Sequence, residues 1–170
     1  FSSNVTQPRT IVKLPWRFPR RHDTRECRFQ NIQLLQNALT HSSYANEFKA
    51  KGEAIMYNER LEFLGDSILG FVSAKYFYEN YSYAEGELTR QRAAKVCEKA
   101  LCGFAKELEI GQALRLGKGE ERTGGRERPS ILADAFEAVL AAIYLDGGLE
   151  EASKLVLRFI PRHDEFDNAK

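Results

Sequence analysis

The segment Asn58-Glu-Arg-Leu-Glu-Phe-Leu-Gly-Asp-Ser67 decides the fold of this 170-residue chain. It opens an apolar-periodic stretch that runs to about Asn80, and this pattern predicts a helix with Asn58 as its N-cap. Three acids interrupt the apolar surface: Glu59, Glu62 and Asp66. Their i, i+3, i+7 spacing places them on one face, where like charges repel and need a positive partner. Gly65 beside Asp66 lets another backbone or a ligand approach closely.

A second apolar stretch, Ser130–Gly147, predicts a helix that lies in the middle of the domain. Pro129 precedes it, Ser130 is its expected N-cap and Gly147 its expected C′ residue. The stretch is apolar on every face, as in helices that are buried all round. Its two interior polar residues, Asp134 and Glu137, share one face. Unpaired buried carboxylates are costly, so we expect the two acidic groups to face each other and share hard divalent cations.

The remaining pattern predicts further helices and no strand. A helical pattern starts at Phe29 and ends around His41–Tyr44, followed by a polar loop that runs to Tyr57. Helices are expected over residues 87–97, 100–108 and 149–160, with a Gly- and charge-rich loop over 118–128. His41 is expected to be a hydrogen-bonded structural histidine, because no acid is placed around it in the sequence.

The two decisive segments resemble the signature segments of the bacterial ribonuclease III nuclease domain. Gly86–Ala93 and Leu114–Gly125 also match this family in order and spacing, and the resemblance extends from about Phe29 to Phe159. It implies an all-α fold, a helical bundle around a buried central helix, which is homodimeric. It implies three regions: a basic N-terminal arm (1–28), the nuclease domain (29–160) and a tail or start of a linker (161–170). The family's usual C-terminal double-stranded-RNA-binding domain is not expected here.

The resemblance also assigns the acids. It implies that the catalytic, metal-binding residues are Glu62, Asp66, Asp134 and Glu137, with Glu59 and Glu87 as supporting acids. The expected cofactor is Mg²⁺, with Mn²⁺ as a substitute, because carboxylates and water suit hard cations. The alternative for the acids is a buried salt-bridge network with Arg60, Arg90 and Arg92. The alternative for Glu87 is a partner for the dipole of its own helix.

The function implied by the resemblance is hydrolysis of both strands of double-stranded RNA, for processing of rRNA, mRNA and small RNAs. The products would carry 5′-phosphate and 3′-hydroxyl ends with a short 3′ overhang. Cutting two strands requires two active sites and hence a homodimer. The interface candidates are Phe63, Leu64 and Ile68, and the RNA-contacting candidates are Arg90, Arg92, Lys95, Arg122 and Arg126. The basic residues of segment 87–97 fit equally well a solvated face or salt bridges.

Two other functional classes stay open at this point. One is a non-catalytic RNA-binding protein of the same fold, and the other is a metal phosphohydrolase acting on small phosphate esters. His22-Asp23 and His163-Asp164 resemble the motif of HD-type phosphohydrolases, but both lie in polar, Pro-flanked ends. No histidine has a glutamate three residues before it, so the Glu-x-x-His pairs of di-iron bundles are excluded.

Composition adds limits on partners and compartment. The net charge is +1, so any RNA-binding surface must be local. Three cysteines without a CxxC pair favour a reducing compartment. No apolar run is long enough for a membrane span, and no small-molecule cofactor is indicated. We therefore expect a cytoplasmic protein, or an organellar one if the basic arm is the remnant of a transit peptide.

Overall fold

The computed structural model describes residues 29–161, and this part of the chain is all-α. The predicted arm, the tail after Pro161 and both His-Asp dipeptides lie outside the described residues. The helices are α1 (Ile32–Ala38), α2 (Ser42–Lys49), α3 (Glu59–Asn80), α4 (Glu85–Lys95), α5 (Glu98–Glu107), α6 (Ile110–Ala113), α7 (Lys118–Arg122), the 3₁₀ helix η1 (Gly125–Glu127) and α8 (Pro129–Phe159). Within residues 29–161 no strand forms, as predicted, and no helix is long and apolar enough to cross a membrane.

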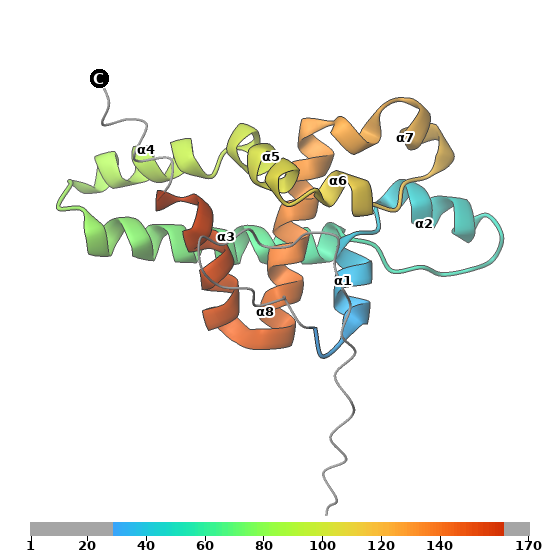
Figure 1. The fold of residues 1–170 in the computed structure, drawn as a ribbon, viewed down its shortest axis with the longest axis horizontal. Helices are drawn as coiled ribbons and strands as arrows, with labels where there is room; N and C mark the ends of the chain where they lie inside the picture. The colour runs from blue at the N-terminus through green and yellow to red at the C-terminus, as the bar shows by residue number, and fades with distance from the viewer. Residues whose placement is uncertain (1–28, 162–170) are drawn as a thin grey trace, which may run out of the picture.

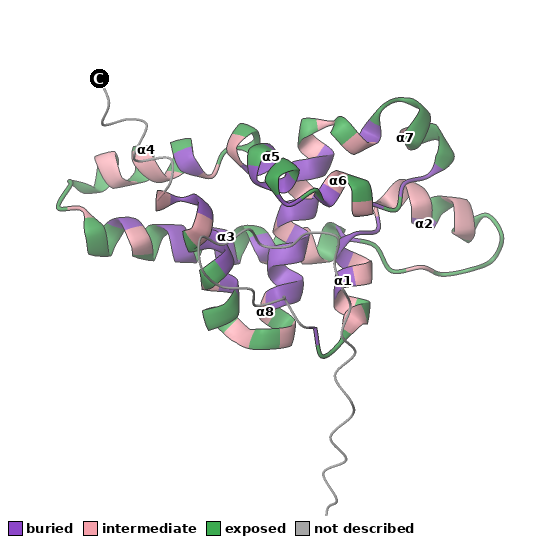
Figure 2. Cartoon of the chain, in the orientation of Figure 1, coloured by how far each residue is buried: buried purple, intermediate pink, exposed green. Residues whose placement is uncertain are grey.

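Helix α8 is the buried centre of the fold, as predicted. It stands across α3 in Figure 1 and packs against α3, α5 and α1. From Ile131 to Ile143 every residue is buried except the two acids, and Figure 2 shows this burial along α8. The predicted ends are each wrong. Arg128 is the N-cap, because Pro129 takes the first helical position that proline favours. The left-handed residue is Gly148 (φ 85°), not Gly147.

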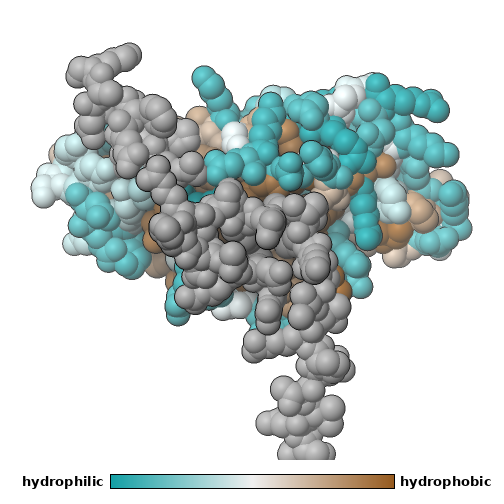
Figure 3. Space-filling view, in the orientation of Figure 1, coloured by the Kyte–Doolittle hydropathy of each residue, from teal (hydrophilic) through white to brown (hydrophobic). Residues whose placement is uncertain are grey.

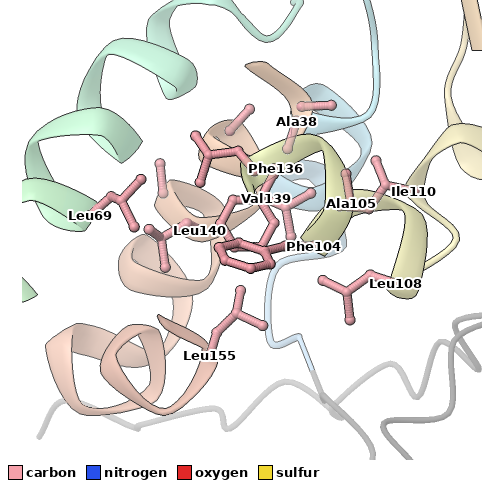
Figure 4. Packing of buried hydrophobic residues seen from close by; sticks show 14 of the residues in the cluster. Ala38, Leu69, Phe104, Ala105, Leu108, Ile110, Phe136, Val139, Leu140 and Leu155 are labelled. Atoms are coloured by element: carbon pink, nitrogen blue, oxygen red, sulfur yellow. The ribbon is translucent and has the colours of Figure 1, made fainter. Parts of the chain in front are cut away.

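The kink at Gly148 sends the last part of α8 back onto the core. Residues 149–159 lie beside α5, where the Phe159 ring stacks on that of Phe104 with centroids 4.6 Å apart. Phe136, from the first part of α8, meets Phe159 edge-on at 6.0 Å. Figure 4 shows Phe104 and Phe136 among the aliphatic side chains of α3, α5 and α8. The core therefore needs both parts of α8.

Helix formation after Phe29 is interrupted, unlike the single helical segment predicted to end around His41–Tyr44. Long-range hydrogen bonds take over at residues 39–41: Arg115 N–H donates to Leu39 O (2.8 Å), and His41 N–H donates to Arg115 O (3.0 Å). A second helix, α2, then begins at Ser42 and shortens the predicted loop. Asn58 N–H donates to Thr40 O at 2.9 Å, which ties the interruption to the start of α3. Asn58 precedes α3 as predicted, but its side chain forms no capping hydrogen bond.

Helix α4 packs against α3, in the part of α3 that lies away from α8 (Figure 1). It starts two residues earlier than predicted and ends at Lys95. The predicted loop over 118–128 instead forms α7 and η1. Hydrophilic residues dominate the surface around α7 in Figure 3. These polar segments lead the chain into α8 and so fix where α8 begins.

Candidate metal centre

The site is built where α3 crosses α8 at a glycine. A Cβ atom placed on Gly65 would lie 1.9 Å from the carbonyl oxygen of Glu137, a separation that no side chain can occupy. The two helix backbones therefore touch at this point, which confirms the expectation that Gly65 admits a close backbone. Glu62 lies one turn before Gly65, so the crossing brings it beside the acids of α8.

Three carboxylates converge at this crossing. Glu62, Asp134 and Glu137 each offer one oxygen, and these oxygens all lie within 4.8 Å of one another. All three side chains are partly buried. One cation could therefore contact all three residues after small side-chain rotations, and Asp134 and Glu137 would contribute from successive turns of one helix.

The negative charges of the cluster favour binding of a cation. Burial raises the pKa of Glu137 to about 8, and the charges of Asp66, Glu62 and Asp134 contribute to that total. Burial is also the main cause that raises the pKa of Glu62, followed by the charge of Asp134. In the described part of the chain, no lysine or arginine forms an ion pair with these three acids. The predicted alternative, a buried salt-bridge network, is therefore not what the described residues form.

The donor set fits a hard divalent ion. Carboxylate oxygens are the ligands that Mg²⁺ and Mn²⁺ prefer, whereas catalytic zinc sites usually include histidine or cysteine. Each pKa rise here reflects a carboxylate that loses hydration and meets other negative charge, and a bound cation would reverse both effects. Glu62, Asp134 and Glu137 are the residues that would hold it.

Two further predicted acids lie near the cluster without joining its centre. Asp66 is exposed, and its charge raises the pKa of both Glu62 and Glu137. Glu59 is exposed in the first turn of α3, and its charge acts on Glu62. Of the four acids predicted to bind metal, the structure thus brings three together and leaves Asp66 at the rim, on the solvent side.

Glu87 lies elsewhere on the same chain. It accepts hydrogen bonds from the guanidinium of Arg90 at 3.0 and 2.8 Å and from the Gln91 amide at 2.6 Å. These bonds, that from Arg90 first, lower the pKa of Glu87. Helix α4 begins beside the end of α3, whereas Glu62 lies near the start of α3, 18 helical residues or about 27 Å before Asn80. The charge of Glu87 is not among the causes that shift the pKa values of Glu62, Asp134 and Glu137, so a supporting role within its own chain has no observation behind it.

Some of the basic residues predicted to contact RNA are buried or bonded to other groups of the protein, and others are not. Arg126 donates to both carboxylate oxygens of Glu121 (2.7 and 2.6 Å) and to the carbonyls of Gly111 and Leu114 (2.8 and 2.7 Å), so it braces the segment before α8. Lys95 is buried, and Arg90 is paired with Glu87. Arg122 is exposed on α7 and Arg92 is half-buried on α4, and neither forms an ion pair within the described residues.

Two residues that the sequence did not assign to the site act on Asp134. Burial is the main cause that raises the pKa of Asp134, the charge of Glu98 raises it further, and His41 lowers it. Glu98 stands in the first turn of α5, and His41 precedes α2. The prediction that His41 is a hydrogen-bonded structural histidine is confirmed, because its Nδ1 accepts from Ser43 N–H at 3.2 Å and lies 2.8 Å from the Ser43 hydroxyl. Its influence on the pKa of Asp134 arises from the tertiary fold, and no local spacing in the sequence signals it.

Comparisons with known proteins identify the family. A sequence profile described as Ribonuclease-III-like matches residues 31–163. The chain belongs to this family. It is 55% identical to ribonuclease 3 of Clostridium tetani over 134 residues, which are 78% of this chain and 55% of the relative. It is 54% identical to ribonuclease 3 of Oceanobacillus iheyensis over 136 residues, 79% of this chain and 57% of the relative. The chain thus spans little more than half the length of these curated relatives.

Solved structures identify the fold as well. The nuclease domain of ribonuclease III from Campylobacter jejuni superimposes with a TM-score of 0.70 and 41% identity, covering 79% of this chain and 89% of that domain. That solved structure shows flexibility in a region involved in dimer formation. The described residues therefore adopt the all-helical ribonuclease III nuclease-domain fold, as the signature segments implied.

Divalent metal should stabilise this ribonuclease III domain more at alkaline than at acidic pH. Between the ordinary value of 4.5 and about 8, folded Glu137 keeps a proton that the unfolded chain has released. The free energy of unfolding of the metal-free protein should therefore fall as pH rises through this window, by about 1–2 kcal/mol after allowance for solvent screening. A bound cation removes this penalty. Thermal unfolding in EDTA and in Mg²⁺ at about pH 5 and about pH 8 measures both effects. An equal rise in Tm at the two pH values would contradict the prediction.

Proposed function

We propose that this chain is a Mg²⁺-dependent, double-strand-specific endoribonuclease, for which Mn²⁺ can substitute. The observation that carries this proposal is the carboxylate cluster of Glu62, Asp134 and Glu137, with which no lysine or arginine of the described residues forms an ion pair. Membership in the ribonuclease III family supports the substrate class. The products would be 5′-phosphate and 3′-hydroxyl ends with short 3′ overhangs, as in processing of rRNA, mRNA and small RNAs. The free thiols Cys97 and Cys102 suit a reducing compartment such as the cytoplasm.

In the proposed mechanism, Glu62, Asp134 and Glu137 would hold the metal ion, and the scissile phosphate would bind through that ion. Mg²⁺ held there would supply a water of lowered pKa and neutralise charge on the phosphate. Glu137 must lose its proton to bind metal, so catalysis requires conditions in which the cation competes with that proton. Asp66, exposed at the rim, is placed to hold water on the solvent side of the cluster, and Glu59 adds negative charge beside Glu62. Arg92 and Arg122 are the candidates for phosphate contacts.

The helix α3 supports a homodimer. Its exposed face carries three aromatic residues: Phe63, Phe71 and Tyr78, with exposed fractions of 78%, 56% and 78%. Spacings of 8 and 15 residues place them within 80° on one side of the helix. A stripe of this kind is typical of an interaction surface. Ile68 belongs to the core and Leu64 is half-buried, so of the predicted interface residues only Phe63 is fully available. Since no observation links Glu87 to the cluster of its own chain, a supporting role for it would involve the second chain.

Replacing Phe63 by Ser should weaken the dimer about 30- to 1000-fold, because an exposed aromatic anchor typically contributes about 2–4 kcal/mol to an interface. Sedimentation across a concentration series measures the dissociation constant. Leu157→Ser, an exposed apolar residue on α8, is the matched control and should leave it unchanged. A monomeric unmodified chain, or equal dissociation of both variants, would contradict this surface as the interface.

Cleavage of a long RNA duplex at low salt with Mg²⁺ tests the proposed activity. Staggered cuts with 5′-phosphate ends, absent with single-stranded RNA and in EDTA, are the expected result. Duplex binding without cuts would instead support the non-catalytic RNA-binding alternative. Hydrolysis of small phosphate esters without duplex cleavage would support the phosphohydrolase alternative.

A further inference from the structure

The excess positive charge of this chain lies in residues 1–28, outside the part that the structure describes. Residues 1–28 carry seven Arg and Lys against two Asp and Glu, which gives a net charge of +5. Residues 29–161, the nuclease domain, carry 16 Arg and Lys against 19 Asp and Glu, which gives a net charge of −3. One Mg²⁺ ion bound at the carboxylate cluster would change this value only to −1. The overall charge of the domain therefore does not attract an RNA duplex, which is a dense line of negative phosphates.

Many cations of the domain are also neutralised by groups of the domain itself. The ion-paired cations include Lys75, Arg90, Arg126, Arg128, Lys154 and Arg158, and Lys95 is buried. Of the residues predicted to contact RNA, Arg92 and Arg122 are left to meet phosphates. Two such contacts in each chain are fewer than the roughly 6–10 that accompany strong, salt-dependent binding of nucleic acids. Tight binding of a duplex thus requires cations from another part of the chain.

The structure fixes the place where residues 1–28 join the domain. Phe29 is buried in the core, and the Asp146 carboxylate accepts hydrogen bonds from the next two backbone N–H groups, Gln30 at 2.8 Å and Asn31 at 2.7 Å. Asp146 follows Glu137 on α8 by nine residues, about 14 Å along the helix axis. A segment of 28 residues can span up to about 90 Å. The basic residues before Phe29 can therefore reach a duplex that is held at the carboxylate cluster.

We propose that residues 1–28 bind the phosphates of the RNA duplex and so supply the electrostatic affinity that the nuclease domain lacks. The inference rests on the proposed function, because its ligand is the duplex that the carboxylate cluster would cut. Arg17, Arg20 and Arg21 lie within five positions of one another, and no acid precedes Asp23 in the sequence. Such a group of like charges suits a polyanionic ligand, because each cation that meets a phosphate releases a counterion.

The salt dependence of duplex binding tests this proposal. It is measured on the full chain in EDTA, so that no RNA is cut, by fluorescence anisotropy of a labelled RNA duplex. Each phosphate contact contributes about 0.9 to the slope of log K against the logarithm of the salt concentration. Replacing Arg20 and Arg21 together by Gln should therefore lower this slope by about 1.8, and lower the affinity at about 0.1 M salt roughly 10- to 100-fold.

The matched control removes the same charge from the domain, by replacing Lys106 and Lys154 together by Gln. Lys106 is exposed in the last turn of α5, and Lys154 is paired with Glu150 and Glu151. The slope should stay close to that of the unmodified chain. Equal losses in the two double variants would show that only the net charge matters and would overturn the proposal.

Two further outcomes separate this inference from the proposed nuclease activity. An unchanged slope in the variant that lacks Arg20 and Arg21 would overturn the role of residues 1–28 and leave the nuclease proposal intact. Duplex binding that depends on these arginines, without any cleavage after addition of Mg²⁺, would refute the nuclease and leave the role of residues 1–28 in place.

Trp16 provides a direct readout, because it is the only tryptophan of the chain and lies beside Arg17 in the sequence. Its emission should change during the titration with duplex, with the same midpoint as the anisotropy. Saturated duplex binding without any change in this emission would contradict the proposal. Vesicles that contain anionic lipid test the other polyanionic surface to which a basic segment binds. A response of Trp16 to vesicles but not to RNA would assign residues 1–28 to a membrane surface and overturn the proposal.

Discussion

Replacing Glu137 by Gln should reduce duplex cleavage by at least about 10³-fold, since a metal ligand lost from the reacting centre removes several kcal/mol of transition-state stabilisation. The amide keeps the size of the side chain but offers a weaker, neutral ligand. The rate of cleavage of a defined RNA duplex, measured at saturating Mg²⁺, gives the size of the loss. Glu150→Gln, an exposed position on the same helix, is the matched control and should cut at the normal rate.

The same variant should gain stability while it loses activity. In the metal-free protein at about pH 8, the Glu137→Gln substitution would remove a carboxylate whose ionisation is opposed by burial and by three neighbouring acids. The Tm in EDTA should therefore rise, and the further rise caused by Mg²⁺ should shrink. An inactive variant with a lowered Tm would indicate that Glu137 supports the fold instead of the metal.

Replacing Gly65 by Ala should destabilise the domain by about 3 kcal/mol or more, because overpacking against backbone cannot be relieved by side-chain rotation. The added methyl group would meet the Glu137 carbonyl at 1.9 Å. The helices α3 and α8 would have to separate, which opens the core and moves Glu62 from its partners. Urea unfolding of the metal-free protein measures the free energy of unfolding directly.

Gly70→Ala is the matched control, because it makes the same change on the same helix. Nothing lies within 4 Å of a Cβ atom at Gly70. Removing a helical glycine there should stabilise the protein by up to about 1 kcal/mol. Equal effects of the two substitutions would show that helix propensity, and not the helix crossing, determines the outcome at Gly65.

The features that the sequence predicted are those with a local physical signature. A helix that is apolar all round and carries two acids on one face has to be buried, and its acids have to find a cation or basic partners. The apolar pattern and the spacing of the acids were therefore enough to place α8 at the centre and to pair Asp134 and Glu137 with Glu62. The family resemblance added Glu87, the roles of the individual acids and the substrate class. Asp66 shows the limit of this reasoning. The spacing of acids along a helix predicts which face they share, but it does not predict how deeply each side chain is buried.

The features that the sequence missed depend on residues far apart in the chain. The break at residues 39–41 exists because Leu39 and His41 pair with Arg115, more than 70 positions later. Arg126 looks like an RNA contact in a glycine-rich segment, yet Glu121 and two carbonyls occupy its guanidinium. A composition rich in Arg and Gly does not show whether an arginine stabilises the fold or binds nucleic acid. That depends on whether the tertiary structure places hydrogen-bond acceptors beside the guanidinium group.

The turn at Gly148 determines where the C-terminal boundary of an independently folding domain can be placed. Since Phe159 returns to stack on Phe104 and Ile160 is fully buried, the last elements of the domain are core residues. Fusion partners or affinity tags joined after Gly147 would replace this return segment and leave the Phe104 and Phe136 rings facing solvent. Such a fragment would keep all three cluster carboxylates in its sequence but lack the packing that holds α8 in place. The usable boundary for protein engineering therefore lies beyond Ile160.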